Sequence, residues 1–424
     1  MPELKLGAGS QVLGKASAIQ VGGQEHPSTA SKSQEVTGSV KKLLQRIRTA
    51  HEAGKPKEVN HLARLYLKSF EARRIAVTEA CSHLSERRRP SADRCHRYAE
   101  GLNAWAGTTE KVIVRAQEKP GKPGHYRTIM DFGIENRSLQ LHVLRLLRVL
   151  ANPRPSQFMM RGGVHAAITR ASQALQGGHI WAMETDLTNC YPSFNEEVVP
   201  ELLPIPKEVT RRVLLAVSLS LWLSTDQFGP ATSVDDDQII IGELFADARQ
   251  GIPQGSSASP LVAELLLAPS FDNLPQEGAS IGYADNFLAM GKNESEAVAM
   301  TLAFWSALKA SPAGHFLPKK PTIFEPGTPI DFLGHCLEKS GAEVRITPSL
   351  YNLSNFKAKL KARLSSIRNA ESSVAQKMHS RAARDFVLSW TAAFKLCDGI
   401  DIHRLEALKK IKASQAKSKL IRAA

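Results

Sequence analysis

The sequence predicts an α+β protein in which helical segments at both ends flank a central region of strands and helices. Apolar residues recur at the three- and four-residue spacing of a helix between residues 40 and 70, and again beyond Pro348. Between these parts, short apolar runs alternate or end at turn residues, as strands do. A chain of 424 residues with 42% hydrophobic and 23% charged residues is globular and long enough for two or three subdomains.

The N-terminal part predicts a leader and then helices. Residues 1–36 are rich in Gly, Ser, Ala and Gln, which favours a mobile leader. Residues 37–110 predict a helical extension, in which Gly54-Lys55-Pro56 separates two amphipathic helices and a third covers about 92–105.

From residue 111 the spacing of apolar residues changes from that of a helix to that of a strand. Strand-like runs at 111–115 and 126–130 flank a Pro-Gly turn, which predicts a β-hairpin with a basic tip. A helix is expected from about Asn136 to Leu150. Further along, we expect strands over 180–186, 238–244 and 280–289, helices over 209–223, 259–267 and 297–309, and a last hairpin from Phe332.

Charge indicates a polyanionic partner. Lys and Arg number 55 against 41 Asp and Glu, a net charge of +14. Residues 351–424 alone hold 16 basic and five acidic residues. Nucleic acid is therefore a better partner than a membrane, although lysine-rich helices can also be merely soluble.

Cysteine usage and hydropathy narrow the class of protein. The five cysteines are scattered and odd in number, so no disulfide framework is indicated and a reducing cytoplasm fits. Cys81, His83, Cys95 and His96 match no usual zinc spacing. Because no apolar run has the length of a membrane span and no signal-peptide core is present, we expect a cytoplasmic protein without a membrane.

Two acidic residues about a hundred positions apart predict the chemistry. Asp186 ends the apolar run from Ile180, and Asp285 lies at the turn of Tyr283-Ala284-Asp285-Asn286. Two Mg²⁺ ions about 4 Å apart must be held by carboxylates from separate strands. A hairpin beside the first strand would supply such a pair, whereas either acid alone is more typical of a solvated turn.

Seven segments follow one another along the chain: Gln117–Arg127, Ser156–His165, Asp186–Phe194, Arg249–Pro260, Tyr283–Asn286, Phe316–Thr322 and Phe332–His335. In this order they resemble the motifs of bacterial non-retroviral reverse transcriptases, the group II intron-like and retron-like enzymes. The most specific is the fourth, where Gly-Ile-Pro-Gln-Gly-Ser is followed by Ser-Pro. The resemblance covers roughly residues 40–360 and implies a right-hand polymerase. Its parts would be the N-terminal extension (37–110), fingers (111–179), a palm with finger insertions (180–345) and a basic helical thumb (346–424).

The resemblance also implies roles for individual residues. Catalysis would fall to Asp186, Asp285, Asn286 and Lys320, and two Mg²⁺ ions, or Mn²⁺ in their place, would be held at Asp186, Leu187 and Asp285. The residues implied to bind the deoxynucleotide are Lys119, Lys122 and Arg127 for its triphosphate, Tyr191 against a 2′-hydroxyl, and Gln254 and Gly255 at its sugar or base. Those implied to contact template or primer are Arg161, Phe332, Leu333 and Gly334.

Two positions depart from the family pattern. Asn286 stands where the family has a second Asp, which removes a charge and predicts weaker Mg²⁺ binding or better activity with Mn²⁺. Natural decay and an engineered substitution both explain it. Pro321 stands directly before Thr322, where the family has its proton-donating Lys, so Lys320 is the predicted donor.

The resemblance implies an RNA-directed DNA polymerase that copies a dedicated non-coding RNA, most similar to the unclassified bacterial enzymes of antiphage defence. Its partners would be the RNA template, the DNA product and dNTPs, and an oligomer is left open. Two alternatives remain at this point. One is template-independent or protein-primed DNA synthesis by the same fold, and the other is a catalytically decayed RNA-binding or splicing-helper protein.

Overall fold

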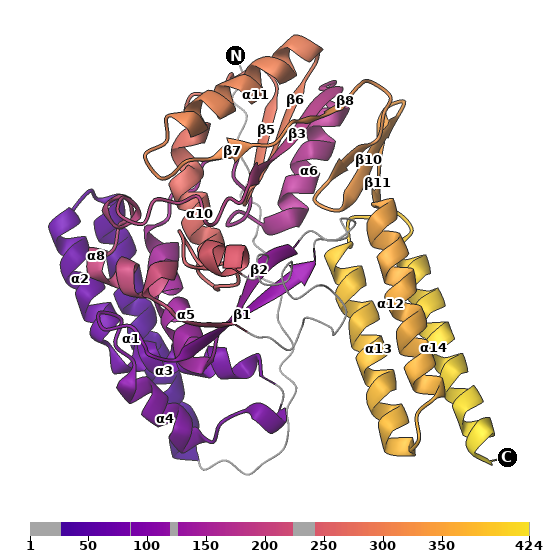
Figure 1. Cartoon of the computed structure of the whole chain (residues 1–424), viewed down its shortest axis with the longest axis horizontal. Coiled ribbons are helices and arrows are strands. Elements are labelled where there is room, and N and C mark those ends of the chain that lie inside the picture. Colours follow the sequence, from indigo (N-terminus) through magenta and orange to yellow (C-terminus); the bar gives the residue numbers. More distant parts are fainter. Residues whose placement is uncertain (1–26, 85, 119–125, 224–241, 424) are drawn as a thin grey trace, which may run out of the picture.

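The computed structural model describes residues 27–84, 86–118, 126–223 and 242–423, apart from the side chains of 27–37, 87, 118 and 417–423. It confirms the α+β class. N-terminal helices lie on one side, a mixed region of sheets and helices lies in the middle, and three long C-terminal helices lie on the other side (Figure 1). Among the described residues, no helix is both long enough and apolar enough to cross a membrane.

Five helices form the N-terminal layer. They are α1 (Pro27–Glu52), α2 (Pro56–Lys68), α3 (Phe70–Ser82), α4 (Ala92–Gly101) and, from beyond the first hairpin, α5 (Ile134–Leu150). Residues 27–36 belong to α1, so the leader predicted over 1–36 extends too far. Residues 1–26 lie outside the described residues. Tyr66 of α2 stacks on His142 of α5 with ring centroids 4.8 Å apart, which joins the first helices to the rest of the core.

A three-stranded sheet follows. Strands β1 (Lys111–Glu118) and β2 (Tyr126–Asp131) form the predicted antiparallel hairpin, and β4 (Ser220–Leu223) pairs with β1 in parallel. The tip of the hairpin, with Lys119 and Lys122, lies outside the described residues.

The segment before β4 corrects the predicted buried helix over 209–223. It divides into α7 (Val199–Leu202), α8 (Lys207–Val209), a π-helical turn (Thr210–Leu214) and a 3₁₀ turn (Ala216–Ser218) before the strand. Pairing with β1 decides the conformation of 220–223, because sheet context overrides local preference in a short apolar run. The predicted strand over 238–244 is also wrong where it is described, since residues 242–248 are helical.

The central sheet positions the two acids. Its order is β5 (Ala279–Tyr283), β6 (Asn286–Gly291), β3 (Trp181–Thr188) and β7 (Leu317–Pro318), and β8 (Thr322–Phe324) pairs with β3 as well. One face packs on α6 (Gly163–Gln176), and the other packs on α11 (Glu294–Lys309). Strand alternation explains this division, because successive side chains of β6 point to opposite faces.

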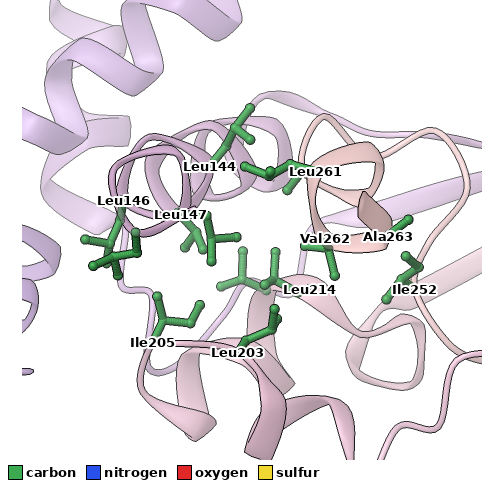
Figure 2. Close-up of a cluster of buried hydrophobic side chains, with 14 of the residues drawn as sticks. Leu144, Leu146, Leu147, Leu203, Ile205, Leu214, Ile252, Leu261, Val262 and Ala263 are labelled. Atoms are coloured by element: carbon green, nitrogen blue, oxygen red, sulfur yellow. The ribbon is translucent and has the colours of Figure 1, made fainter. Parts of the chain in front are cut away.

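Helix α10 (Ser259–Leu267) is held by a leucine-rich core. Figure 2 shows Leu144 and Leu147 of α5 facing Leu261 and Val262 of α10, with Leu214 between them. All five side chains are buried. This core fixes α10, and with it the glycine-rich loop that precedes the helix. A 3₁₀ turn (Ala268–Phe271) continues α10 toward β5.

The C-terminal part begins with a small sheet and ends in a helical bundle. Strands β9 (Ile330–Phe332), β10 (His335–Ser340) and β11 (Glu343–Pro348) form an antiparallel sheet. Helices α12 (Leu350–Arg368), α13 (Ser373–Ala393) and α14 (Ile400–Ala423) follow as a bundle (Figure 1). Phe356 and Trp390 stack at 4.0 Å between α12 and α13. The predicted C-terminal helical region is therefore present, with most of its Lys and Arg side chains exposed.

Candidate active site

The sheet brings Asp186 and Asp285 together. Asp186 lies near the end of β3, where the register pairs it with Asn286, and Asp285 lies at the turn between β5 and β6. Ala284 adopts a positive φ of 53°, which tightens that turn, and Leu187 N–H donates to the Asp285 carbonyl at 3.2 Å. Both aspartates line the same cavity of about 300 Å³. Their convergence, predicted from the sequence, is confirmed.

The two carboxylates differ in their surroundings. Burial, followed by the charge of Asp186, raises the pKa of Asp285. Asn286 Nδ2 donates to Asp285 Oδ1 at 3.2 Å, so the amide acts here as a donor rather than as a third anion. Asp186 Oδ2 accepts from the ammonium of Lys319, whereas Asp186 Oδ1 is buried without a partner in the described part of the chain.

These oxygens fit a divalent metal ion. Mg²⁺ prefers carboxylate oxygen, and a buried, unpaired carboxylate oxygen is the group that a cation would satisfy. Leu187 can contribute only its backbone, because its side chain is in the core. Within the described residues, no three His, Cys, Asp or Glu side chains gather as a metal site. The donor set therefore consists of two carboxylates rather than three.

Lys319, not Lys320, is the lysine at the acid pair. Its Nζ lies 2.5 Å from Asp186 Oδ2, and its backbone N–H donates to the Asp186 carbonyl at 2.9 Å. Thr185 Oγ1 donates to the Lys319 carbonyl at 2.8 Å and fixes the segment further. Lys320 is exposed and is not among the residues that line the cavity. The pairing of β7 with β3 decides this one-residue difference.

The glycine-rich loop lines the same cavity as Lys319. Gly251 adopts a φ of 62°, and a Cβ at this position would overlap the Tyr191 carbonyl oxygen. Gly255 adopts a φ of 101°, and a Cβ there would lie 2.6 Å from the Met130 carbonyl oxygen. Met130 N–H donates to the Gln254 carbonyl at 3.0 Å, so the loop is held between β2 and the turn after β3. Glycine is required because only it combines these conformations with such close approach.

Three predicted nucleotide-binding side chains line the cavity. Tyr191 and Gln254 are half-buried, and Arg127 is exposed at the rim. Burial, followed by the Asp285 charge, raises the pKa of the Tyr191 hydroxyl, so the hydroxyl stays neutral at physiological pH. Arg127 donates twice to Gln117 Oε1, at 3.0 and 2.7 Å, which holds its guanidinium against the neighbouring strand β1.

The predicted template and primer residues lie apart from this cavity. Arg161 is exposed in the loop before α6. Phe332 is only 1% exposed and packs in the core, which leaves the turn after it as the accessible part of the predicted primer contact. In that turn Leu333 has a φ of 47°, and the Gly334 carbonyl accepts from Ser349 N–H at 2.9 Å, next to the start of α12.

Sequence reasoning missed two acids near the site. Glu184 lies two residues before Asp186 on the same face of β3, and burial, followed by the charges of Asp186 and Asp331, raises its pKa to about 7. The period of two along a strand could have identified it. Asp247 lines the cavity just before the glycine-rich loop, and no motif pointed to it.

A larger cavity lies elsewhere. It has a volume of about 910 Å³ and is enclosed by the α1–α2 turn, Trp105 and residues 203–211. None of the predicted site residues lines it. Size alone therefore does not mark the candidate site; the acid pair does.

Comparison with known proteins adds one distant likeness. No family model and no curated protein sequence matches the chain. Among solved structures, the telomerase from Candida albicans in complex with a TWJ fragment of telomeric RNA matches with a TM-score of 0.35 and 14% sequence identity. The match covers 74% of this chain and 61% of the telomerase chain. A likeness of this size supports no conclusion about fold or activity.

Proposed function

We propose that the chain is an RNA-directed DNA polymerase acting by two-metal nucleotidyl transfer. The observation that carries the proposal is the shared cavity, in which Asp186 and Asp285 lie with Tyr191, Gln254 and Arg127. Five segments between Arg127 and Lys319, spread over about 190 residues of sequence, contribute to this one site. Such a combination of paired acids, a cation and a glycine-rich loop suits a nucleoside triphosphate and not merely a metal.

The acid pair would hold the two divalent cations. When bound, these ions supply charge neutralisation at the phosphate and activation of the attacking primer oxygen. Lys319 balances the negative charge of Asp186, and we assign to it the proton transfer to the leaving pyrophosphate that the sequence assigned to Lys320. The Lys319 backbone is held by Asp186, and its ammonium contacts the carboxylate of the same residue.

The remaining residues orient the nucleotide. Arg127, together with Lys119 and Lys122 of the same hairpin, would hold the triphosphate. The ring of Tyr191 would occupy the space of a 2′-hydroxyl and so select deoxynucleotides. Gln254 would hydrogen-bond the sugar or base. Arg161, the turn at Leu333 and Gly334, and the exposed cations of α12–α14 would contact the nucleic-acid backbone.

One observation favours a second candidate function. Asn286 donates to Asp285 instead of adding a carboxylate, so the site has fewer anions than the family pattern implies. An RNA-binding protein without catalysis would tolerate this loss. Against it, a decayed site has no need to keep Asp186, Asp285 and the constrained loop around Gln254.

An incorporation assay distinguishes these functions. Purified protein is given labelled dNTPs with Mg²⁺ or Mn²⁺ and a primed RNA, a primed DNA or no template, with Asp285→Ala as the control. Template-dependent extension that is lost in Asp285→Ala supports the polymerase. Extension without template supports untemplated or protein-primed synthesis. RNA binding without incorporation under any condition supports the second candidate and refutes the polymerase.

The proposed template and the proposed biological role rest on the family resemblance alone. A dedicated non-coding RNA is the proposed template, and antiphage defence is the proposed role. Sequencing the nucleic acid that copurifies with the protein would identify the template. Phage plating on cells with the wild-type chain or Asp285→Ala would test the role, and equal plating would refute it.

A further inference from the structure

A buried carboxylate lies beneath the loop that carries Arg161. Glu264, in the middle of α10, is 2% exposed, and its Oε2 accepts from the Met160 backbone N–H at 2.9 Å. Its own backbone carbonyl accepts from Gln157 Nε2 at 2.7 Å, and Gln157 is equally buried. One turn of α10 therefore holds the loop at two points on either side of Phe158.

The same loop is bound to the strand that leads to Asp285. Phe158 N–H donates to the Gly282 carbonyl at 3.0 Å, and Gly282 N–H donates to the Ser156 carbonyl at 2.7 Å. Ser280 Oγ donates to Ser156 Oγ at 2.8 Å. The loop therefore pairs with the edge of β5 at Gly282, three residues before Asp285. Glu264 lies where this edge meets the helix that follows the glycine-rich loop.

Packing alone does not explain an acid at this position. Glu264 Oε1 is buried and has no hydrogen-bond partner in the described ranges. Burial raises the pKa of Glu264 to about 7, against the backbone N–H groups of Met160 and Met159 and the charge of Arg161, which lower it. An apolar residue would fill the same space without an unpaired carboxylate oxygen, but it would leave the Met160 N–H without its acceptor. The acid is useful because it accepts from the loop backbone.

Arg161 directly follows Met160, whose backbone N–H is bound to Glu264. The Arg161 backbone N–H donates to the Phe158 carbonyl at 3.2 Å, which turns the chain immediately after Met160. Its side chain is exposed, and no hydrogen bond or ion pair holds the guanidinium among the residues described. The loop backbone, together with the charge of Glu264, therefore decides where this cation lies.

We propose that Glu264 is the positioning residue for Arg161: it fixes the backbone of the loop so that this guanidinium meets the nucleic-acid backbone in register with the Asp285 hairpin. The inference rests on the proposed function, because it names nucleic acid as the partner of Arg161. Glu264 acts through the loop and does not touch the substrate.

Two variants of Glu264 separate the effect of side-chain volume from the effect of the hydrogen-bond acceptor. Glu264→Leu keeps the volume but removes the acceptor, whereas Glu264→Gln keeps both. We expect the affinity for a fluorescently labelled primed RNA, measured by anisotropy without dNTPs, to fall roughly tenfold in Glu264→Leu and in Arg161→Ala. Glu264→Gln should stay within about twofold of wild type. The double variant should bind no more weakly than Arg161→Ala, because the two residues act as one unit.

A control at a less buried acid tests whether the loss of any carboxylate acceptor lowers the affinity. Glu296 of α11 also accepts a backbone N–H, that of Lys292 at 2.8 Å, far along the sequence from the loop. Glu296→Leu should leave the affinity unchanged. Should Glu264→Leu fail to fold, Glu264→Asn takes its place, since its amide is one methylene too short to reach Met160.

Hydrogen exchange gives a readout that needs no nucleic acid. Amides of residues 156–163 should exchange faster in Glu264→Leu and at the wild-type rate in Glu264→Gln. A wild-type chain that binds no primed RNA would refute the proposed function, while exchange would still show whether Glu264 holds the loop. Unchanged exchange in Glu264→Leu, additive losses in the double variant, or a Gln variant as weak as Leu would overturn the positioning role.

Discussion

Lys319 contacts Asp186 through two different groups. Its backbone N–H donates to the carbonyl of Asp186 at 2.9 Å, and its Nζ lies 2.5 Å from Oδ2 of the same residue. The backbone contact places the ammonium before any substrate binds. Both lysines are exposed, but Lys320, the next residue, has neither contact and does not line the cavity.

The first prediction follows from this difference. Lys319→Ala should lower the single-turnover rate of nucleotide addition by about 100-fold, the usual range for loss of a general acid. Lys320→Ala is the matched control and should stay within about twofold of wild type. Rapid-quench measurement on a primed template checks both. If Lys319→Ala kept the wild-type rate and Lys320→Ala were slow, Lys320 would be the proton donor, as the sequence predicted.

Tyr191 predicts the choice of sugar. Tyr191→Ala should open space for a 2′-hydroxyl and lower the ratio of kcat/KM for dNTP over rNTP by at least roughly tenfold, about 1.4 kcal/mol. Tyr191→Phe should keep the wild-type ratio, because the ring and not the neutral hydroxyl excludes the ribose. Single-nucleotide incorporation kinetics give the ratio. Equal ratios in all three proteins would remove Tyr191 from this role.

Gly251 predicts a stability effect. Gly251→Ala would force a Cβ into the Tyr191 carbonyl at a positive φ, and should cost about 2–3 kcal/mol in the free energy of unfolding. Gly54→Ala is the control, since Gly54 has a similar φ of 64° but no atom within 4 Å of the added Cβ. It should cost about 1 kcal/mol. Urea unfolding measures both, and equal losses would show that strain rather than overlap dominates.

Glu184 predicts how stability depends on pH. Its pKa rises from 4.5 to about 7 on folding, so the folded state binds this proton more tightly than the unfolded chain. Stability of the wild type relative to Glu184→Gln should therefore be greatest below about pH 4.5, fall as the pH rises through 7, and level off above it. The difference should be on the order of 2 kcal/mol. Urea unfolding without divalent cations between pH 5 and 8.5 checks it, and a flat difference would contradict the shift.

Asn286 predicts the metal dependence. Asn286→Asp should replace a donor to Asp285 with a second anion and move the Mg²⁺ midpoint of incorporation roughly tenfold lower, because ligand charge sets affinity for a hard cation. The advantage of Mn²⁺ over Mg²⁺ should shrink in the same variant. Titrations of initial rate against each metal give the midpoints. Identical midpoints in the two proteins would show that this position does not limit metal binding.

The sequence predicted the acid pair and the loop because their signals are local. A carboxylate at the end of an apolar run, or Gly-Ile-Pro-Gln-Gly-Ser before a helix, can be recognised within a dozen residues. It failed for Ser220–Leu223, where a short apolar run is compatible with helix and strand alike and only pairing with β1 decides. It also assigned Phe332 to a primer contact, although that ring lies in the core.

The amino-acid sequence by itself determined the α+β class, the order of the segments and the pair of aspartates at the site, because strand period and turn residues place them. Only the tertiary structure decided that Lys319 rather than Lys320 reaches Asp186, and that Glu264 supports the Arg161 loop. Both depend on strand register and on contacts between segments a hundred or more residues apart. A shift of one residue in register turns every side chain to the other face, and no local pattern reports such a shift.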